Sequence, residues 1–401
     1  MTSKTAESST ERPRALDAST MVEAFQLTAE DHADHLAIRT KAGEVEITWS
    51  EYAERVQRLA GGLSGIGLER GQTMALMLTN RPEFHVFDAA AMHLGAIPYS
   101  IYNTYAPEQI EHQIGDAESA ILVTEKAFLD QVLDVRGRAD GLEQIIVVDG
   151  DGSDDTLTIE DVESAASEDF DFEQTWRSVE PDDLLTLIYT SGTTGDPKGV
   201  ELRHSGITQA LRSADEVIGF PVAGRVVSWL PMAHVAERAC GHYIPMGFGL
   251  TTTCCPDPAE VAEYLPEVRP SWFFSPPRLW EKLKASIEAS LEDEEDDEKR
   301  QATEQALEVG RERMRLVQSG EEVPDDLQDK WDKADEQVLS KIRERLGFDV
   351  AVAVNVAAAP CPDEVIEFFH AIGVPLADMW GLSEHSGLAT CNPPDRIKIG
   401  T

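Results

Sequence analysis

The sequence predicts an α/β fold in which parallel sheets are covered by helices. Short apolar runs such as Met74–Leu78 and residues 145–148 have the length of buried strands. Segments with helical spacing lie between such runs, for example residues 84–94, which end at Gly95. Strands that alternate with helices favour parallel pairing, because a helix can return the chain to the same edge of the sheet.

The elements follow in order along the chain. Residues 1–20 are polar, and we expect this N-terminal segment to be disordered. Ser50 is expected to cap a helix whose apolar residues recur at helical spacing. Further strands are expected at residues 120–123, 185–189, 226–229, 250–254, 272–274 and 350–356. The acidic stretch 149–183 is interpreted as a loop-rich connection, and residues 362–372 as a helix.

Residues 278–346 differ from this alternation. They are rich in Glu, Lys, Arg, Leu and Ala, and they contain seven consecutive acidic residues at 292–298. We interpret them as a helical insertion with a solvated acidic face. An acidic segment that binds a partner protein is the alternative interpretation.

The charge balance excludes some partners. The chain has 74 acidic and 34 basic residues, a formal net charge of −40. Nucleic acids and anionic membrane surfaces would be repelled. The acids are spread along the whole chain, which favours a protein of a halophilic cytoplasm over one with an acidic interaction tail.

The cysteines and the apolar runs agree with that location. None of the five cysteines forms a C-x-x-C pair, so a zinc site is not expected. The odd number of cysteines without a disulfide pattern favours a reducing cytoplasm. The start has no apolar signal sequence, and no apolar run approaches the roughly 18 residues of a membrane span.

The segment Tyr189-Thr-Ser-Gly-Thr-Thr-Gly-Asp-Pro-Lys-Gly-Val200 predicts a polyphosphate site. Its glycines let backbone N–H groups approach an anion, and its lysine adds a point charge. A Walker A loop is excluded because Gly199 follows Lys198. A polar surface loop is the alternative. The residues that we expect to bind phosphate are Thr190, Ser191, Gly192, Thr193, Thr194, Gly195 and Lys198.

This string resembles the phosphate-binding loop of the adenylate-forming (AMP-binding) superfamily, and two further segments resemble motifs of the same superfamily. Trp229-Leu-Pro-Met-Ala-His-Val-Ala-Glu-Arg238 is similar to its L-P-x-x-H segment, which implies that His234 lies by the acyl carboxylate. A lone structural histidine is the alternative. Met379-Trp-Gly-Leu-Ser-Glu384 resembles the aromatic-G-x-[ST]-E motif.

The resemblance assigns roles to the residues of the last motif. Trp380 would pack on adenine, and Gly381 is expected among the nucleotide-binding residues. Ser383 would lie beside the α-phosphate, and Glu384 would hold Mg²⁺, which prefers oxygen ligands. A core Trp380 and a surface Glu384 are the alternative. The small-residue stretch Ala358, Ala359 and Pro360 would line the adenine, although relatives usually carry Gly within it.

The resemblance also implies the architecture and the reaction. We expect an AMP-binding domain over residues 21–401 with two doubly wound parallel-sheet subdomains, an incomplete β-barrel and no small C-terminal domain. The reaction is the ATP-dependent conversion of an acid to an acyl-adenylate and then to an acyl-CoA, with Mg²⁺, ATP, CoA and a fatty acid as cofactor and partners.

The long-chain subfamily is indicated by Pro277-Arg-Leu-Trp-Glu-Lys282 and the insertion. Aryl- and medium-chain-acid CoA ligases remain alternatives, and so does an inactive nucleotide- or acyl-binding remnant. Only seventeen residues follow Glu384, so we expect a carboxy-terminally truncated chain with little turnover of its own. A homodimer is left open.

Overall fold

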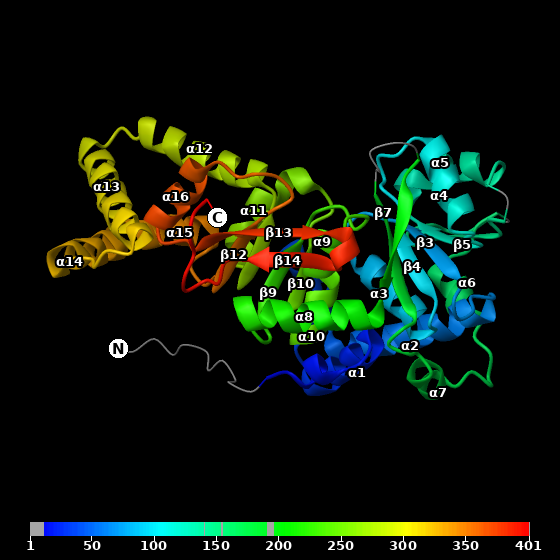
Figure 1. Ribbon diagram of the computed structural model, residues 1–401. Helices are drawn as coiled ribbons and strands as arrows, with labels where there is room; N and C mark the ends of the chain where they lie inside the picture. Colours follow the sequence, from blue (N-terminus) through cyan, green and yellow to red (C-terminus); the bar gives the residue numbers. More distant parts are fainter. Residues whose placement is uncertain (1–11, 140, 154, 191–195, 401) are drawn as a thin grey trace. The chain divides into compact units, whose positions relative to one another are not determined.

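The computed structural model describes residues 12–139, 141–153, 155–190 and 196–400. The chain divides into two compact units. The first unit runs through Arg212 and adds Ser228–Pro258 and Ser383–Gly387, whereas the second comprises Ser213–Val227, Ala259–Leu382 and Leu388–Thr401. Both units contain parallel strands and helices, which confirms the predicted α/β class (Figure 1).

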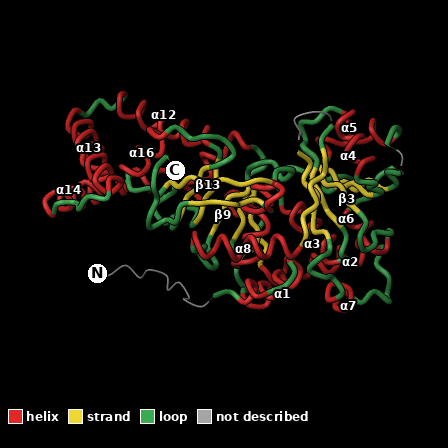
Figure 2. The backbone as a smooth tube through the Cα atoms, viewed as in Figure 1, coloured by secondary structure: helices red, strands yellow, loops and turns green. Residues whose placement is uncertain are grey.

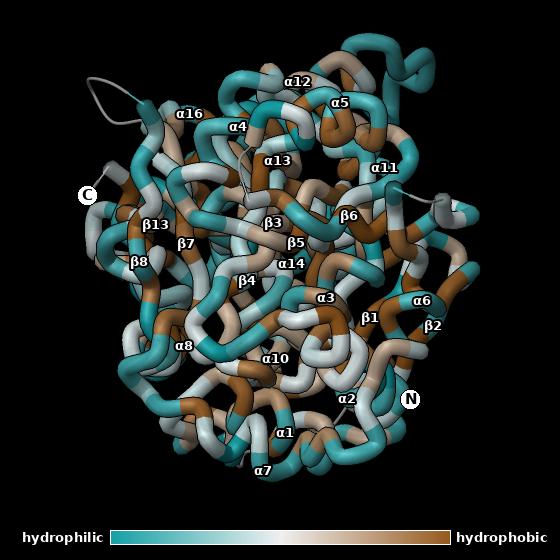
Figure 3. Tube along the Cα trace, turned by 90° about the vertical axis from the view of Figure 1, so that its right-hand side faces the viewer, coloured by the Kyte–Doolittle hydropathy of each residue, from teal (hydrophilic) through white to brown (hydrophobic). Residues whose placement is uncertain are grey.

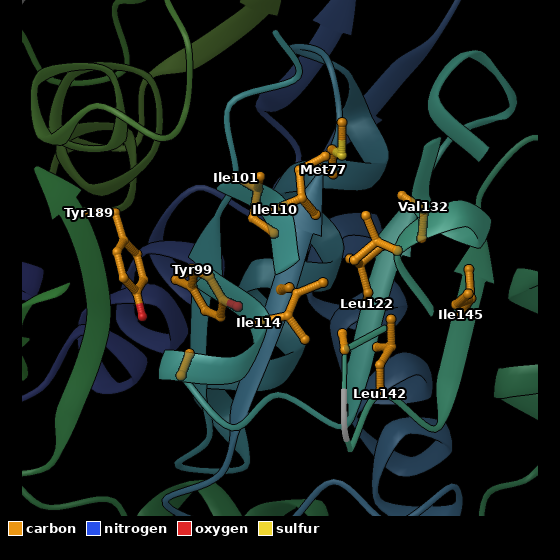
Figure 4. Close-up of a cluster of buried hydrophobic side chains, with 14 of the residues drawn as sticks. Met77, Tyr99, Ile101, Ile110, Ile114, Leu122, Val132, Leu142, Ile145 and Tyr189 are labelled. Atoms are coloured by element: carbon orange, nitrogen blue, oxygen red, sulfur yellow. The ribbon is translucent and has the colours of Figure 1, made fainter. Parts of the chain in front are cut away.

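The first unit contains a sheet that is parallel throughout, with strand order β4-β3-β5-β6. The strands are β3 (Thr73–Met77), β4 (Ile97–Ser100), β5 (Ile121–Thr124) and β6 (Gln144–Val147). Successive side chains point to opposite faces, so Ala75 and Met77 join a core cluster with helices α4 (Pro107–Asp116) and α5 (Lys126–Arg136) (Figure 4). Helix α3 (Pro82–His93) contacts β3 and β4.

Helix α2 (Trp49–Gly65) begins one residue earlier than its expected cap. Thr48, not Ser50, is the N-cap residue: its hydroxyl accepts from the backbone N–H of Glu51, and the Glu51 carboxylate accepts from the Thr48 N–H. This reciprocal capping box satisfies two backbone donors, which a cap at Ser50 would not do. The expectation at Ser50 was therefore wrong.

The segment before the first helix also departs from the expectation of disorder. Residues 14–17 form a 3₁₀ turn (η1), and Leu16 is buried. The Arg212 guanidinium donates to the Leu16 and Ala18 carbonyls at 2.7 and 2.6 Å. Buried apolar side chains and paired carbonyls order residues 12–20, whereas residues 1–11 lie outside the described chain.

The first unit holds further strands. Strand β1 (Leu36–Thr40) pairs antiparallel with β2 (Glu46–Thr48) and parallel with β10 (Thr251–Cys254). Strand β9 (Arg225–Ser228), through which the chain passes from the second unit to the first, completes this sheet. β7 (Leu184–Thr190) and β8 (Lys198–Arg203) form an antiparallel hairpin. In the described part of the chain, no sheet closes into a barrel.

Helices complete the first unit. They are α1 (Met21–Asp31), α6 (Ile159–Ser164), α7 (Phe172–Arg177), α8 (His204–Ile218), α9 (Val235–Glu237), the π-helical turn η3 (Arg238–Tyr243) and α10 (Ile244–Phe248). The last residues of α8 belong to the second unit. Two short helices, α6 and α7, therefore lie in the stretch that was expected to be mainly loop.

The second unit is built on the sheet β11-β12-β13-β14, in which β11, β12 and β13 are parallel. Its strands are β11 (Trp272–Ser275), β12 (Ala353–Val356), β13 (Leu376–Leu382) and β14 (Gly387–Cys391). Helices α11 (Val261–Val268) and α16 (Asp363–Ala371) belong to the same unit.

The insertion between β11 and β12 is helical, as the sequence predicted (Figure 2). It consists of α12 (Pro277–Glu292), α13 (Asp297–Ser319), α14 (Asp325–Ala334), the π-helical turn η5 (Asp335–Leu339) and α15 (Ser340–Leu346). Gly310 lets α13 approach α16 closely, since a Cβ there would lie 2.1 Å from the Ala371 carbonyl oxygen.

Hydrophilic residues recur along the outer turns of the chain (Figure 3), as the acidic composition requires. Across the described ranges, no helix has both the length and the apolar character needed to cross a bilayer.

Candidate functional site

The predicted phosphate loop connects the two strands of the β7–β8 hairpin. Thr190 is the last residue of β7 and lies directly opposite Lys198, the first residue of β8. Lys198 is exposed, so its ammonium group is available to an anion. Ser191, Gly192, Thr193, Thr194 and Gly195 lie outside the described residues. The sequence analysis missed the return strand, although the apolar positions Val200 and Leu202 alternate with polar ones.

The turn that carries the predicted metal ligand packs against the same hairpin. Ser383 and Glu384 lie in the 3₁₀ turn η6 (Ser383–His385), which contacts β8 within the first unit. A Cβ at Gly206, near the start of α8, would lie 2.9 Å from Ser386 Oγ, so the turn approaches α8 closely. Glu384 is exposed. The hairpin and this turn therefore place an ammonium group and a carboxylate in neighbouring elements.

His234 is the N-cap residue of α9. Its Nδ1 accepts from the backbone N–H of Ala236 at 3.1 Å. An accepting Nδ1 leaves the proton of a neutral imidazole on Nε2. The side chain is exposed to solvent, yet the surrounding chain lowers the pKa of His234 through desolvation, which favours this neutral form. The Nε2–H group can therefore donate to an acceptor such as a carboxylate.

The buried side chain of Glu237 holds the turn that precedes His234. Glu237 accepts from the backbone N–H groups of Trp229 at 3.2 Å and Leu230 at 3.1 Å. Asn80 donates to Ser228 Oγ at 2.8 Å and to the Leu230 carbonyl at 3.0 Å. Burial raises the pKa of Glu237 to about 8, although its hydrogen bonds with Ser228, Leu230 and Trp229 oppose the shift. Glu237 thus fixes the backbone instead of facing a ligand.

Arg238 forms a second buried network next to Glu237. Its guanidinium pairs with Asp88 and donates to Ser100 Oγ at 2.7 Å and to the Pro98 carbonyl at 3.0 Å. His242 Nε2 lies 2.9 Å from the other oxygen of Asp88. Arg238 and Asp88 are both fully buried. These contacts tie η3 to α3 and β4, so the last two residues of the motif at 229–238 are structural.

The second unit brings five of the predicted nucleotide-binding residues together. A cavity of about 950 Å³ is lined by Ala358, Ala359, Pro360, Trp380 and Gly381. Trp380 is 54% exposed, so much of its indole is open to a ligand. Ala358 adopts φ +71°, a conformation that L-residues rarely take. The loop after β12 thus contains a strained backbone conformation at a position that lines this cavity.

The same cavity contains polar residues that the sequence analysis missed. Asp378, in β13, and Asn392, after β14, both line it. Burial raises the pKa of Asp378, and the neighbouring Asp363 raises it further. Asp378 lies two residues before Trp380 in the same strand. Because side chains alternate between the two faces of a strand, the sequence could have placed Asp378 on the same face as Trp380. Asn392 had no such signal, because β14 was not expected.

The residues present suit a magnesium ion that is shared with a polyphosphate. No group of three His, Cys, Asp or Glu side chains forms a ready metal site within the described ranges. Mg²⁺ commonly takes one or two carboxylates, and substrate phosphates and waters supply its other ligands. The exposed carboxylate of Glu384 fits that donor set.

Comparison with known proteins agrees with these motifs. The AMP-binding enzyme family matches residues 25–401. The fatty-acid–CoA ligase fadD11 of Mycobacterium tuberculosis is 47% identical over 247 residues, which cover 61% of this chain and 43% of that protein. A long-chain-fatty-acid–CoA ligase of Xenopus laevis, ACSBG2, is 30% identical over 395 residues, 95% of this chain and 53% of its own. The chain thus spans about half the length of these relatives.

A solved structure extends the comparison to the fold. The long-chain-fatty-acid–CoA ligase FadD1 of Archaeoglobus fulgidus superposes with a TM-score of 0.70 at 18% identity, over 94% of this chain and 66% of that one. At this identity the likeness concerns the fold alone.

Proposed function

This chain belongs to the AMP-binding enzyme family, and from that premise we propose that it binds Mg·ATP and a long-chain fatty acid for acyl-adenylate formation. The adenylate would then pass its acyl group to CoA, with AMP and diphosphate as the other products. The cavity that gathers five predicted nucleotide-binding residues around the exposed Trp380 is the observation that carries this proposal.

The cavity suits an adenine ring for physical reasons. An indole face offers a large flat surface on which a base can stack. The small side chains of Ala358 and Ala359 leave room beside it. Asp378 and Asn392 could accept or donate hydrogen bonds at the rim of the base.

Lys198 and Glu384 carry the charges that we assign to the phosphates and their metal ion. Lys198 is a point charge at the start of β8, and point charges of this kind neutralise phosphoryl oxygens. Glu384 would hold Mg²⁺ together with phosphate oxygens. When bound, the ion would neutralise charge on the triphosphate and help orient it.

His234 is suited to the acid substrate. Its neutral imidazole presents Nε2–H as a donor, because Nδ1 is occupied by the Ala236 N–H. A donor of this kind can orient the fatty-acid carboxylate for attack on the α-phosphorus without a net positive charge that would lower its nucleophilicity. Positioning is the main contribution that a protein makes to phosphoryl chemistry of this type.

Long-chain specificity is supported by the names of the relatives and by the helical insertion, and it needs its own test. We suggest equilibrium binding of acyl sulfamoyl adenosines, which mimic the adenylate, with hexanoyl, decanoyl, palmitoyl and benzoyl groups. The palmitoyl compound is expected to bind at least about tenfold more tightly than the hexanoyl compound, because each buried methylene contributes up to about 0.8 kcal/mol.

Two further results would decide between the alternatives. Tightest binding of the benzoyl compound would indicate an aryl-acid ligase, and no binding of any analogue would refute the proposed function. Palmitamide, which lacks the adenosine group, controls for adhesion of the chain to apolar surface and is expected to bind far more weakly.

A further inference from the structure

Helix α4 is hydrogen-bonded to both arms of the hairpin that carries the predicted phosphate loop. His112 Nε2 lies 3.0 Å from the carbonyl oxygen of Pro197, the residue before Lys198. Tyr189, the residue before Thr190, donates from its hydroxyl to Asp116 Oδ2 at 2.8 Å. The two contacts therefore fall next to the two ends of the loop.

The two α4 residues that make these contacts are neighbours on the surface of the helix. His112 and Asp116 are four residues apart, so they lie on the same face of the helix, one turn apart. A carbonyl oxygen can only accept, so His112 is the donor to Pro197. The helix itself is fixed, because Ile110 and Ile114 are fully buried in the core cluster of the first unit (Figure 4).

The ring of Tyr189 also contacts the second strand of the hairpin. Tyr189 pairs with Gly199 across the two strands, and its side chain is buried. A Cβ at Gly199 would lie 3.3 Å from Tyr189 Cζ, so the ring packs directly over the glycine. The tyrosine therefore links α4 to β7 through its hydroxyl and to β8 through its ring.

We propose that His112 and Asp116 are positioning residues for polyphosphate binding. They hold the backbone next to Thr190 and Lys198 in a fixed place, so that the Lys198 ammonium meets the phosphates without a prior rearrangement. This inference rests on the proposed function and adds to it a set of residues outside the three motifs. Their effect is confined to ligands that carry β- and γ-phosphates.

The test compares two ligands on the full chain. The dissociation constants of Mg·ATP and of the palmitoyl sulfamoyl adenosine, which lacks β- and γ-phosphates, are measured for wild type and for His112→Leu and Tyr189→Phe. Each variant removes the side-chain hydrogen bonding between α4 and one arm of the hairpin, so ATP affinity is expected to fall roughly 3- to 10-fold while the affinity of the analogue stays unchanged. Tyr189→Phe keeps the ring over Gly199, which guards against a folding defect.

Conservative variants sharpen the result. His112→Gln retains a donor and Asp116→Asn retains an acceptor. Both variants are therefore expected to bind ATP with nearly wild-type affinity. Glu111→Leu, a neighbour on α4, serves as the matched control. Equal weakening of both ligands by His112→Leu, or no weakening of either, would overturn the positioning role while the proposed function stands. Failure of the wild type to bind either ligand would instead refute the proposed function.

Discussion

Two motif segments of this chain are built in opposite ways. In the segment 228–243, the polar residues Glu237, Arg238 and His242 are buried, and each is hydrogen-bonded to other groups of the protein. In the segment 378–384, Trp380 and Glu384 are exposed. The difference teaches that residues of a recognisable motif can serve two purposes. Those in the first segment hold a turn so that His234 is presented, whereas those in the second are open to a ligand.

Removal of Arg238 should therefore produce the largest effect on stability. Arg238→Met leaves the buried Asp88 carboxylate without its main partner, and breaking such a pair typically costs about 3–5 kcal/mol. Urea denaturation measures the free energy of unfolding. Arg177→Met is the matched control, since its pair with Glu173 is exposed and should cost less than about 1 kcal/mol. Equal costs for the two variants would break the comparison.

The pH dependence of stability should show the next effect. Because the pKa of Glu237 is raised to about 8 in the folded chain, the native state retains a proton that the unfolded state releases near pH 4.5. That stability is present at low pH and is lost as the pH rises through 8. Between pH 7 and 9 the wild type should lose about 1.4 kcal/mol more than Glu237→Gln. Parallel curves for the two proteins would show that Glu237 does not titrate in this range.

A smaller effect is expected at the edge of the cavity. Ala358→Gly relieves the strain of a positive φ, which typically costs about 1–2 kcal/mol, but it also adds freedom to the unfolded chain. The free energy of unfolding should rise by less than about 1 kcal/mol, as judged by thermal or urea denaturation. A clear loss of stability would mean that the Ala358 methyl group packs usefully in the native loop.

The smallest change in stability is expected for Trp380→Ala. Substitutions of exposed side chains usually alter the free energy of unfolding by less than about 0.5 kcal/mol. Urea denaturation next to Arg238→Met would show the contrast directly. Should Trp380→Ala destabilise the protein as strongly as Arg238→Met, Trp380 would be a structural residue.

Much of the fold could be predicted from local pattern. The apolar runs at β3 and β5 are short and continuous, as expected for strands buried between helices. The insertion was clear from its composition. The errors came from features that depend on contacts distant in the sequence. Leu16 is ordered because Arg212 reaches its carbonyl, and no local signal near residue 16 shows this.

The site was predictable where residues line the cavity and less so where they face the protein. Ala358, Pro360 and Trp380 do line one cavity of the second unit. The structural role of Arg238 could not be inferred, because its partner Asp88 lies 150 residues earlier. The His112 contact to Pro197 spans 85 residues and was missed for the same reason.

Equilibrium binding of Mg·ATP to wild type, Trp380→Ala and Val317→Ala tests the central claim most directly. Val317 is a similarly exposed apolar residue in α13 and is absent from the cavity lining, so it controls for surface changes. Loss of a stacking aromatic ring typically costs about 1–3 kcal/mol per base. We therefore expect Trp380→Ala to bind roughly tenfold more weakly than wild type, and Val317→Ala to bind with wild-type affinity. Equal affinity of all three folded proteins, or no binding to the wild type, would contradict the account.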